Sequence, residues 1–406
     1  MKNLPDWLTP EPWLNRNFSA SDVQSALGAE APDEATLAAL LSPAAADFLE
    51  PMAARAQALT QRHFGRTIQL YVPLYLSSYC SGGCAYCGFA ADRRTDRHAL
   101  DFPSVEKELD AIHAMGFEEV LLLTGERSSQ ADLDYLRECV RLAARRFHNV
   151  TVEVFPMAEE EYRSLTEAGC TGVTLYQETY HPETYDRMHR WGPKKDFLQR
   201  LDAPSRALAG GMRFAGLGAL LGLADPRYDM LALYRHVRHL QKTFWQAGLA
   251  VSFPRIRNEE GGFVPPHPVD EKMLAQIIFA FRICLPDVPL VLSTREGAAF
   301  RDGMAGLGVN KMSIASKTTV GGYGSEGSKE GQFDVSDARG LNEFCAMLRA
   351  KQLDPVFKNW DGVYRSAALF SHRSSASNIF IFVVCCSAGS LSSSSLVLSA
   401  HCFAFA

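Results

Sequence analysis

Three cysteines stand close together in the segment Cys80-Ser-Gly-Gly-Cys84-Ala-Tyr-Cys87. Three thiolates on one short segment can bind three irons of a [4Fe-4S] cluster and leave the fourth iron open to an outside ligand. The intervening pair Gly82-Gly83 lets such a segment wrap closely around the cluster. The alternative is zinc, which takes four ligands in a closed site; His98 is the nearby candidate for the fourth, and no second ligand stands beside it.

Polar groups that could bind a small molecule follow apolar runs at three further points: TGE (124–126), YQETYH (176–181) and STRE (293–296). Taken alone, the first is equally consistent with an ordinary turn and the second with a helix-capping loop. In the third, Arg295 could bind a carboxylate through two parallel hydrogen bonds. It could instead form a structural ion pair with Glu296 at the protein surface.

Short strand-like runs position all of these groups. The predicted strands are 68–76, 119–124, 150–155, 172–177, 213–223, 249–256, 289–294 and 309–316. The predicted helices between and after them are 104–116, 132–147, 159–169, 197–211, 228–248, 269–285 and 297–308. About eight alternating units predict an α/β fold, a (β/α)8 TIM-type barrel, in residues 66–361 with C-terminal helical elements. An Ala-rich N-terminal helical extension is predicted for residues 1–65. In such a barrel active residues lie at the carboxyl ends of the strands, where each of these motifs falls.

Composition narrows the class of protein. The 406 residues carry 41 basic and 46 acidic side chains, a formal charge of −5, and 47% are hydrophobic. This excludes a largely disordered chain and gives no broad attraction for nucleic acid, so a small molecule or a protein is the expected partner. The start of the chain has no apolar run of the kind a secretory signal needs, so we expect a cytoplasmic protein with reduced cysteines.

The composition changes near the C-terminus. Residues 374–406 contain no Asp, Glu, Lys or Arg, and they are rich in Ser. Two apolar patches, 379–386 and 396–406, are each shorter than the ~20 residues of a membrane helix, so no membrane association is expected. We interpret residues 362–406 as an atypical, disordered tail without a function.

The cysteine segment resembles the signature of the radical S-adenosylmethionine (radical SAM) enzymes, C-x3-C-x-aromatic-C, with Tyr86 as the aromatic residue. The resemblance implies that Cys80, Cys84 and Cys87 hold a [4Fe-4S] cluster whose open iron binds S-adenosyl-L-methionine (SAM), with Tyr86 beside the adenine. TGE is similar to the family's Gly-Gly-Glu motif, with Thr124 in place of the first Gly, so Glu126 would bind the methionyl amino group. By the same resemblance, Glu178 and Arg187 would contact the ribose and carboxylate of SAM.

Longer stretches resemble one group within that family. YVPLYLSSYC, LLLTGE, YQETYHPETY, GLGALLGL, SFPRIR, LSTRE, FRD and SKTTVGGY follow one another as they do in the ThiH family of 2-iminoacetate synthases, the tyrosine lyases of thiamine biosynthesis. The resemblance runs from about residue 17 to Asp361. It implies cleavage of the Cα–Cβ bond of L-tyrosine to 2-iminoacetate (dehydroglycine) and p-cresol, with 5′-deoxyadenosine and methionine formed. Arg295 would hold the tyrosine carboxylate, and Ser313 is a candidate second contact.

The same resemblance implies two protein partners: the thiazole synthase ThiG, and an electron donor such as flavodoxin or ferredoxin. One rival is a HydG-like tyrosine lyase of hydrogenase maturation. HydG needs a C-terminal C-x2-C, whereas this tail offers Cys385-Cys386 and Cys402. Another rival is a non-catalytic iron–sulfur or zinc protein. Finally, the Gly-rich KTTVGGYGSEG (317–327) lacks a phosphate-loop GK[ST] and is interpreted as a flexible lid over the barrel mouth.

Overall fold

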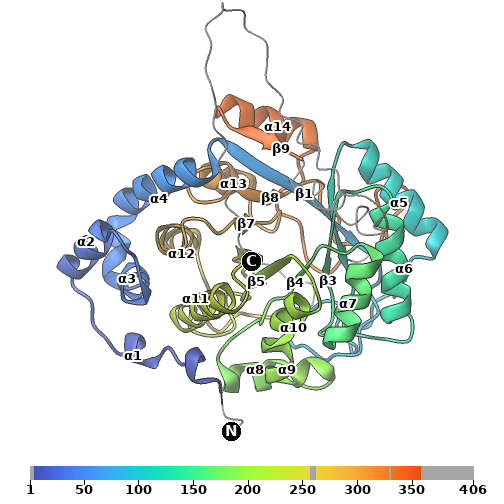
Figure 1. The fold of residues 1–406 in the computed structure, drawn as a ribbon, viewed down its shortest axis with the longest axis horizontal. Helices are drawn as coiled ribbons and strands as arrows, with labels where there is room; N and C mark the ends of the chain where they lie inside the picture. Colours follow the sequence, from blue (N-terminus) through green and yellow to red (C-terminus); the bar gives the residue numbers. More distant parts are fainter. Residues whose placement is uncertain (1–3, 257–261, 329–330, 358–406) are drawn as a thin grey trace, which may run out of the picture. The chain divides into compact units, whose positions relative to one another are not determined.

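The computed structural model describes residues 4–256, 262–328 and 331–357. The predicted tail, 362–406, lies outside the described residues. Eight parallel strands close into a barrel (Figure 1): β1 (Thr67–Tyr75), β2 (Glu119–Leu123), β3 (Asn149–Glu153), β4 (Gly172–Thr174), β5 (Phe214–Gly218), β6 (Gly248–Ser252), β7 (Leu290–Leu292) and β8 (Lys311–Ser313). The barrel closes where β1 pairs with both β2 and β8. The predicted fold class is confirmed.

Helices follow the strands and surround the barrel. They are α5 (Phe102–Ala114), α6 (Leu133–Ala144), α7 (Glu159–Ala168), α8 (Pro182–Met188), α9 (Phe197–Leu201), α10 (Ala203–Ala209), α11 (Pro226–Thr243), α12 (Glu271–Cys284) and α13 (Ala298–Met304). Asp101, Asp132 and Asp270 cap α5, α6 and α12, because each carboxylate accepts a hydrogen bond from the backbone N–H three residues on. The predicted helix 197–211 is divided into α9 and α10, with Pro204 in the first turn of α10.

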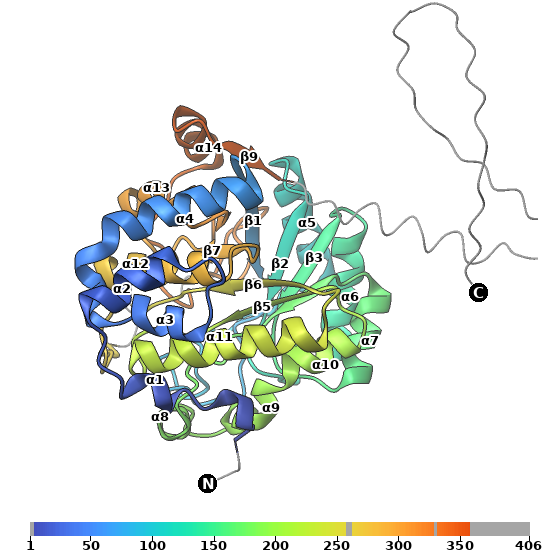
Figure 2. The same cartoon turned by 60° about the vertical axis from the view of Figure 1, so that its left-hand side comes forward.

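The N-terminal segment forms four helices on the outside of the barrel (Figure 2): α1 (Glu11–Leu14), α2 (Ala20–Gly28), α3 (Glu34–Leu40) and α4 (Leu49–Phe64). Of these, α1, α3 and α4 pack on α11 or α12, and α2 packs on α3 and α4. The Gln276 side-chain amide of α12 donates hydrogen bonds to the carbonyls of Leu40 and Ser42. Near the end of the described residues lie α14 (Leu341–Ala350) and the short β9 (Asp354–Val356), which pairs with the start of β1. Neither the helix α8 nor the strand β9 was predicted.

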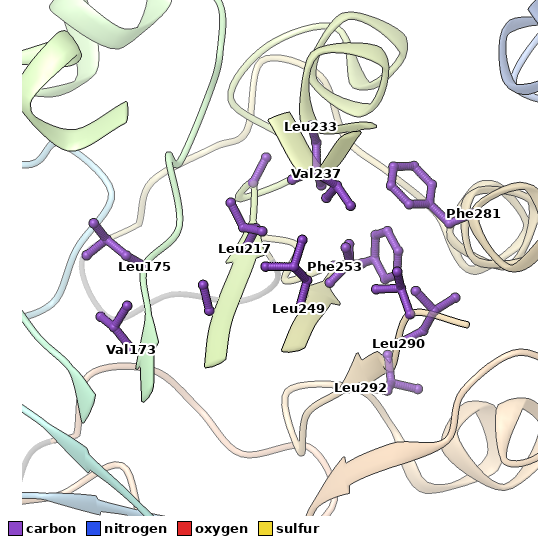
Figure 3. Close-up of a cluster of buried hydrophobic side chains, with 14 of the residues drawn as sticks. Val173, Leu175, Leu217, Leu233, Val237, Leu249, Phe253, Phe281, Leu290 and Leu292 are labelled. Carbon is purple, nitrogen blue, oxygen red and sulfur yellow. The ribbon is translucent and has the colours of Figure 1, made fainter. Parts of the chain in front are cut away.

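Alternation along the strands separates an apolar outer face from a polar inner one. Figure 3 shows outer side chains of β5 to β7, including Leu217, Leu249 and Leu290, near Leu233 of α11 and Phe281 of α12. Val173 of β4 belongs to the same hydrophobic core. The inner face carries polar and aromatic side chains, among them an ion pair between Lys311 and Glu119. The helix-facing surface therefore supplies the hydrophobic core, and the interior is left for polar groups. Among the described residues, the structure contains no helix long and apolar enough to cross a membrane.

Candidate active site

The cysteine loop begins just after β1 and is held by hydrogen bonds to sulfur. The backbone N–H groups of Gly82 and Glu126 both point at the Cys80 thiol, with N–Sγ distances of 3.4 Å. The Gln332 amide lies 3.8 Å from the Cys87 sulfur. Donors placed around sulfur favour a thiolate, the form that binds iron.

Burial of the cysteine side chains disfavours ionisation of their thiols when no metal is bound. It raises the pKa of Cys84 to about 12, although Lys194 acts the other way. It also raises the pKa of Cys87, with the neighbouring Cys80 contributing. Metal binding at these thiols therefore has to release protons. In the described part of the chain, no group of three or more His, Cys, Asp or Glu side chains is arranged to bind a single metal ion. His98, the candidate fourth ligand for zinc, lies 3.3 Å from Asp96.

The residues after α8 clamp the cysteine loop from the other side. Gly83 N–H donates to the Trp191 carbonyl at 3.0 Å, and Ala85 N–H donates to the Met188 carbonyl at 2.9 Å. A Cβ atom at Gly83 would lie 2.2 Å from the Trp191 ring, so only glycine fits there. This explains the second glycine of the cysteine segment.

Tyr86 is held by a buried histidine. Its hydroxyl lies 2.8 Å from His189 Nε2, while His189 Nδ1 lies 2.8 Å from the Tyr185 carbonyl. Because a carbonyl can only accept, Nδ1 carries the proton and Nε2 accepts from the Tyr86 hydroxyl. Burial first, and then the positive charges of Lys194 and Arg200, lower the pKa of His189 to about 2, which keeps the ring neutral.

Glu126 lies next to Cys80 with one oxygen unused. A Cβ at Gly125 would lie 2.5 Å from the Tyr79 carbonyl, so the close approach of β2 to the cysteine loop requires glycine. Glu126 Oε1 accepts from Arg200 Nη1 at 3.0 Å. Glu126 Oε2 is buried and has no hydrogen-bond partner among the described residues. A buried carboxylate oxygen without a donor fits an ammonium group brought by a ligand.

Glu178 belongs to the same charged network. It has a left-handed backbone (φ 70°) just beyond β4, accepts from Lys194 Nζ at 2.6 Å and lies 3.4 Å from Arg200 Nη2. Burial alone would lower the pKa of Arg200, but the carboxylates of Glu126 and Glu178 raise it. Arg200 also donates to the Tyr176 carbonyl at 2.7 Å. Two carboxylates and two cations therefore form one buried network beside the cysteine loop.

Arg295 and Ser313 lie at the carboxyl ends of β7 and β8, and β8 pairs with β1 in the closed barrel. The Arg295 guanidinium lies 3.6 Å from the centre of the Phe333 ring, an arrangement that fixes its plane. Glu296 is engaged by Arg255, which donates to both of its oxygens, at 2.8 and 2.5 Å. Arg255 is therefore an ion-pair partner of Glu296. Ser313 Oγ accepts from the Thr294 N–H at 3.1 Å.

These groups line one cavity at the carboxyl ends of the strands. It contains about 900 Å³ of space between the atoms, part of it open to solvent. Its walls include five predicted site residues from four parts of the barrel: Tyr86, Cys87, Glu178, Arg295 and Ser313. Glu126 joins them through Arg200. Arg187 does not: its side chain is exposed in the last turn of α8, where it donates to Thr184.

The loop predicted as a lid lies over this cavity and is fastened at its tip. Thr318, Gln332 and Phe333 line the cavity from the loop and the residues after it. The Tyr323 and Gly324 N–H groups both donate to the Glu108 carboxylate of α5, at 2.6 and 3.1 Å. Opening of the loop would have to break these hydrogen bonds. The loop is therefore an anchored cover over the cavity.

Comparison with known proteins gives the family. Residues 74–223 match the model of the Radical SAM superfamily, and residues 252–354 match the Biotin and Thiamin Synthesis associated domain. The chain is 44% identical to the 2-iminoacetate synthases of Salmonella typhimurium and Escherichia coli, over 84% of this chain and 91% of each relative. The chain belongs to the 2-iminoacetate synthase family.

This member of the 2-iminoacetate synthase family is also similar in structure to a hydrogenase maturase. A crystal structure of HydG, a maturase of the [FeFe]-hydrogenase, superposes with a TM-score of 0.82 at 27% identity, covering 91% of this chain and 85% of that one. The barrel and its closure are therefore shared between the two groups. Identity is higher to the synthases, which favours the ThiH group over HydG.

Sequence reasoning missed three charged groups of this site: Glu153 and Lys194, which line the cavity, and Arg200, which pairs with Glu126 and Glu178. Glu153 ends β3 and lines the cavity wall. Its place as a charged residue at the carboxyl end of a strand was a usable signal, because catalytic residues of barrels lie at strand ends. Lys194 and Arg200 lie in short helical turns after α8. No sequence pattern marked them, since charged residues in such turns are usually solvated.

Proposed function

We propose that the protein cleaves the Cα–Cβ bond of L-tyrosine, giving 2-iminoacetate and p-cresol, and so supplies the carbon–nitrogen fragment of the thiamine thiazole. The single observation behind this proposal is that one cavity is lined both by the cysteine loop and by Arg295 and Ser313. A cofactor on one side and an amino-acid carboxylate on the other would then face each other.

The chain offers a fitting set of ligands for a [4Fe-4S] cluster and SAM. We assign Cys80, Cys84 and Cys87 to the cluster, and the unpartnered Oε2 of Glu126 to the methionyl ammonium. We also assign Glu178 and Tyr86 to contacts with the rest of SAM. When bound, these groups supply a 5′-deoxyadenosyl radical, and the protein's part is orientation and exclusion of water.

On the substrate side, we assign the carboxylate of tyrosine to Arg295. A guanidinium fixes both distance and direction through two parallel bonds, and stacking on Phe333 holds its plane. The Ser313 hydroxyl lines the same wall and offers a further polar contact. The anchored cover formed by residues 317–328 and 331–333 would shield the reacting carbon atoms from water.

We further propose that the imine product passes to the thiazole synthase ThiG, since a free imine hydrolyses readily. Flavodoxin or ferredoxin would supply the electron, and the cytoplasm is the compartment where such donors are reduced. The match to a domain associated with biotin and thiamin synthesis supports the pathway.

The test is an anaerobic incubation of reconstituted protein with SAM, a reductant and each aromatic amino acid in turn. We expect tyrosine to give p-cresol and 5′-deoxyadenosine, with glyoxylate from hydrolysis of the imine. Deoxyadenosine without p-cresol or glyoxylate would overturn the tyrosine assignment and leave the radical SAM class standing. A non-catalytic protein would give none of the three products.

A further inference from the structure

The carboxylates of the cavity are unequally matched by cations. Glu126 and Glu178 both lie within 3.4 Å of Arg200, and Glu178 also binds Lys194. Glu153 is different: within the described ranges its carboxylate makes no hydrogen bond and no ion pair, although it lines the same cavity. A carboxylate that faces a cavity without a neighbouring cation can bind a positively charged group of a ligand.

The strand geometry aims Glu153 at the substrate side. Val150 and Val152 of β3 belong to the hydrophobic core outside the barrel. Alternation therefore turns Thr151 and Glu153 inward, and Thr151 lines the lower part of the barrel interior. Glu153 is one pleat higher, at the cavity that also holds Arg295 and Ser313.

We propose that Glu153 binds the α-amino group of the amino-acid substrate, opposite the Arg295 that binds its carboxylate. This inference rests on the proposed function, because it takes the occupant of the cavity to be an amino acid. An α-amino acid is a zwitterion, so a site that recognises it needs an anion as well as a cation. Glu126 and Glu178 are already engaged on the cofactor side, and Glu153 is the carboxylate that remains.

The electrostatics of the cavity also fit a proton acceptor. Burial and the charge of Glu178 raise the pKa of Glu153 to about 7, against the opposing effects of Arg295, Arg200 and Lys194. Three tyrosines that line this space, Tyr71, Tyr75 and Tyr176, have raised pKa values and stay neutral. The other titratable groups in the lining are Tyr86, Cys87, Glu178, Lys194 and Arg295. A proton can then pass from the substrate ammonium nitrogen to a Glu153 oxygen, leaving a neutral amine and a carboxylic acid, with no transfer of electrons.

Ligand binding tests this inference apart from turnover. Affinities of tyrosine and of its des-amino analogue, 3-(4-hydroxyphenyl)propionate, would be measured by anaerobic calorimetry with the SAM-loaded holoenzyme and its Glu153→Gln variant. We expect the variant to bind tyrosine about 10- to 100-fold more weakly, the effect of one charge-assisted contact. The analogue lacks the amine, so its affinity should change less than about 2-fold by the same reasoning. The surface variant Glu160→Gln, on the exposed side of α7, is the matched control and should alter neither affinity.

The outcomes separate this inference from the proposed function. Equal weakening of both ligands would show that Glu153 only maintains the cavity, and unchanged tyrosine affinity would show that it does not touch the amine; either overturns the inference. If another amino acid binds in place of tyrosine and loses affinity in the variant, the substrate assignment fails and the role of Glu153 stands. If the wild-type holoenzyme binds no amino acid, both are wrong.

Discussion

Replacing Arg295 with Lys tests the substrate side of the site. Lys keeps the positive charge but loses the planar pair of donors, and an ammonium cannot stack on Phe333 as a guanidinium does at 3.6 Å. Loss of one charge-assisted contact is worth about 1.5–3 kcal/mol, so tyrosine-dependent turnover should fall ~10- to 100-fold. The fold should tolerate the change, because the neighbouring Glu296 is held by Arg255.

The assay follows p-cresol and 5′-deoxyadenosine in parallel under anaerobic conditions. We expect p-cresol to fall while deoxyadenosine formed without substrate cleavage persists, since the cofactor groups lie on other strands. Arg141→Lys is the control: Arg141 forms an exposed pair with Glu138 on α6, and its replacement should have no effect. Near-normal tyrosine kinetics in Arg295→Lys would refute the carboxylate role, and a parallel fall of both products would indicate a damaged cofactor site instead.

Three further predictions follow from the site. Reconstituted protein should contain about four irons and four sulfides per chain, which give it a brown colour. Cys80→Ala should abolish the cluster, whereas Cys139→Ala, a change in the hydrophobic core, should keep it. A single bound zinc without brown colour would contradict the cluster. A protein shortened after residue 373 should bind iron and cleave tyrosine as the full chain does, and loss of the cluster on truncation would show that the tail is needed. Because the pKa of Glu153 is raised to about 7 and its ionised form is the one that binds an ammonium, kcat/KM for tyrosine should decline as pH drops through about 7; a pH–rate profile of Glu153→Gln that kept this limb would assign it to another group.

The barrel could be predicted because each strand is a short apolar run between helices with clear caps. Strands such as EVLLL pack one face against the surrounding helices. Their apolar residues are therefore consecutive in the sequence and can be recognised locally. The three-residue strand β9 carried no such signal, since Pro355 within it is unusual for a strand and its pairing depends on the distant start of β1. Pairing between segments far apart in the chain cannot be read from either segment alone.

The site was predictable where chemistry imposes fixed spacing. The three cysteines must converge on one cluster, so their spacing is local and recognisable. Arg200 and Lys194 reach Glu126 and Glu178 only through the folding of the residues after α8, and their roles are set by tertiary contacts. Arg187 follows YQETYH closely in sequence, but the helix α8 turns its side chain to the surface, away from the cavity.

The central claim is tested most directly by the product balance from tyrosine labelled with ¹³C at Cβ and, separately, at Cα. Cleavage between these atoms predicts label from Cβ in the methyl group of p-cresol and label from Cα in glyoxylate, in equal amounts and with one 5′-deoxyadenosine for each. The Cys80→Ala protein should give none of these products. Label from both carbons in one product, such as a coumarate formed by loss of ammonia, would contradict carbon–carbon cleavage and with it the proposed function.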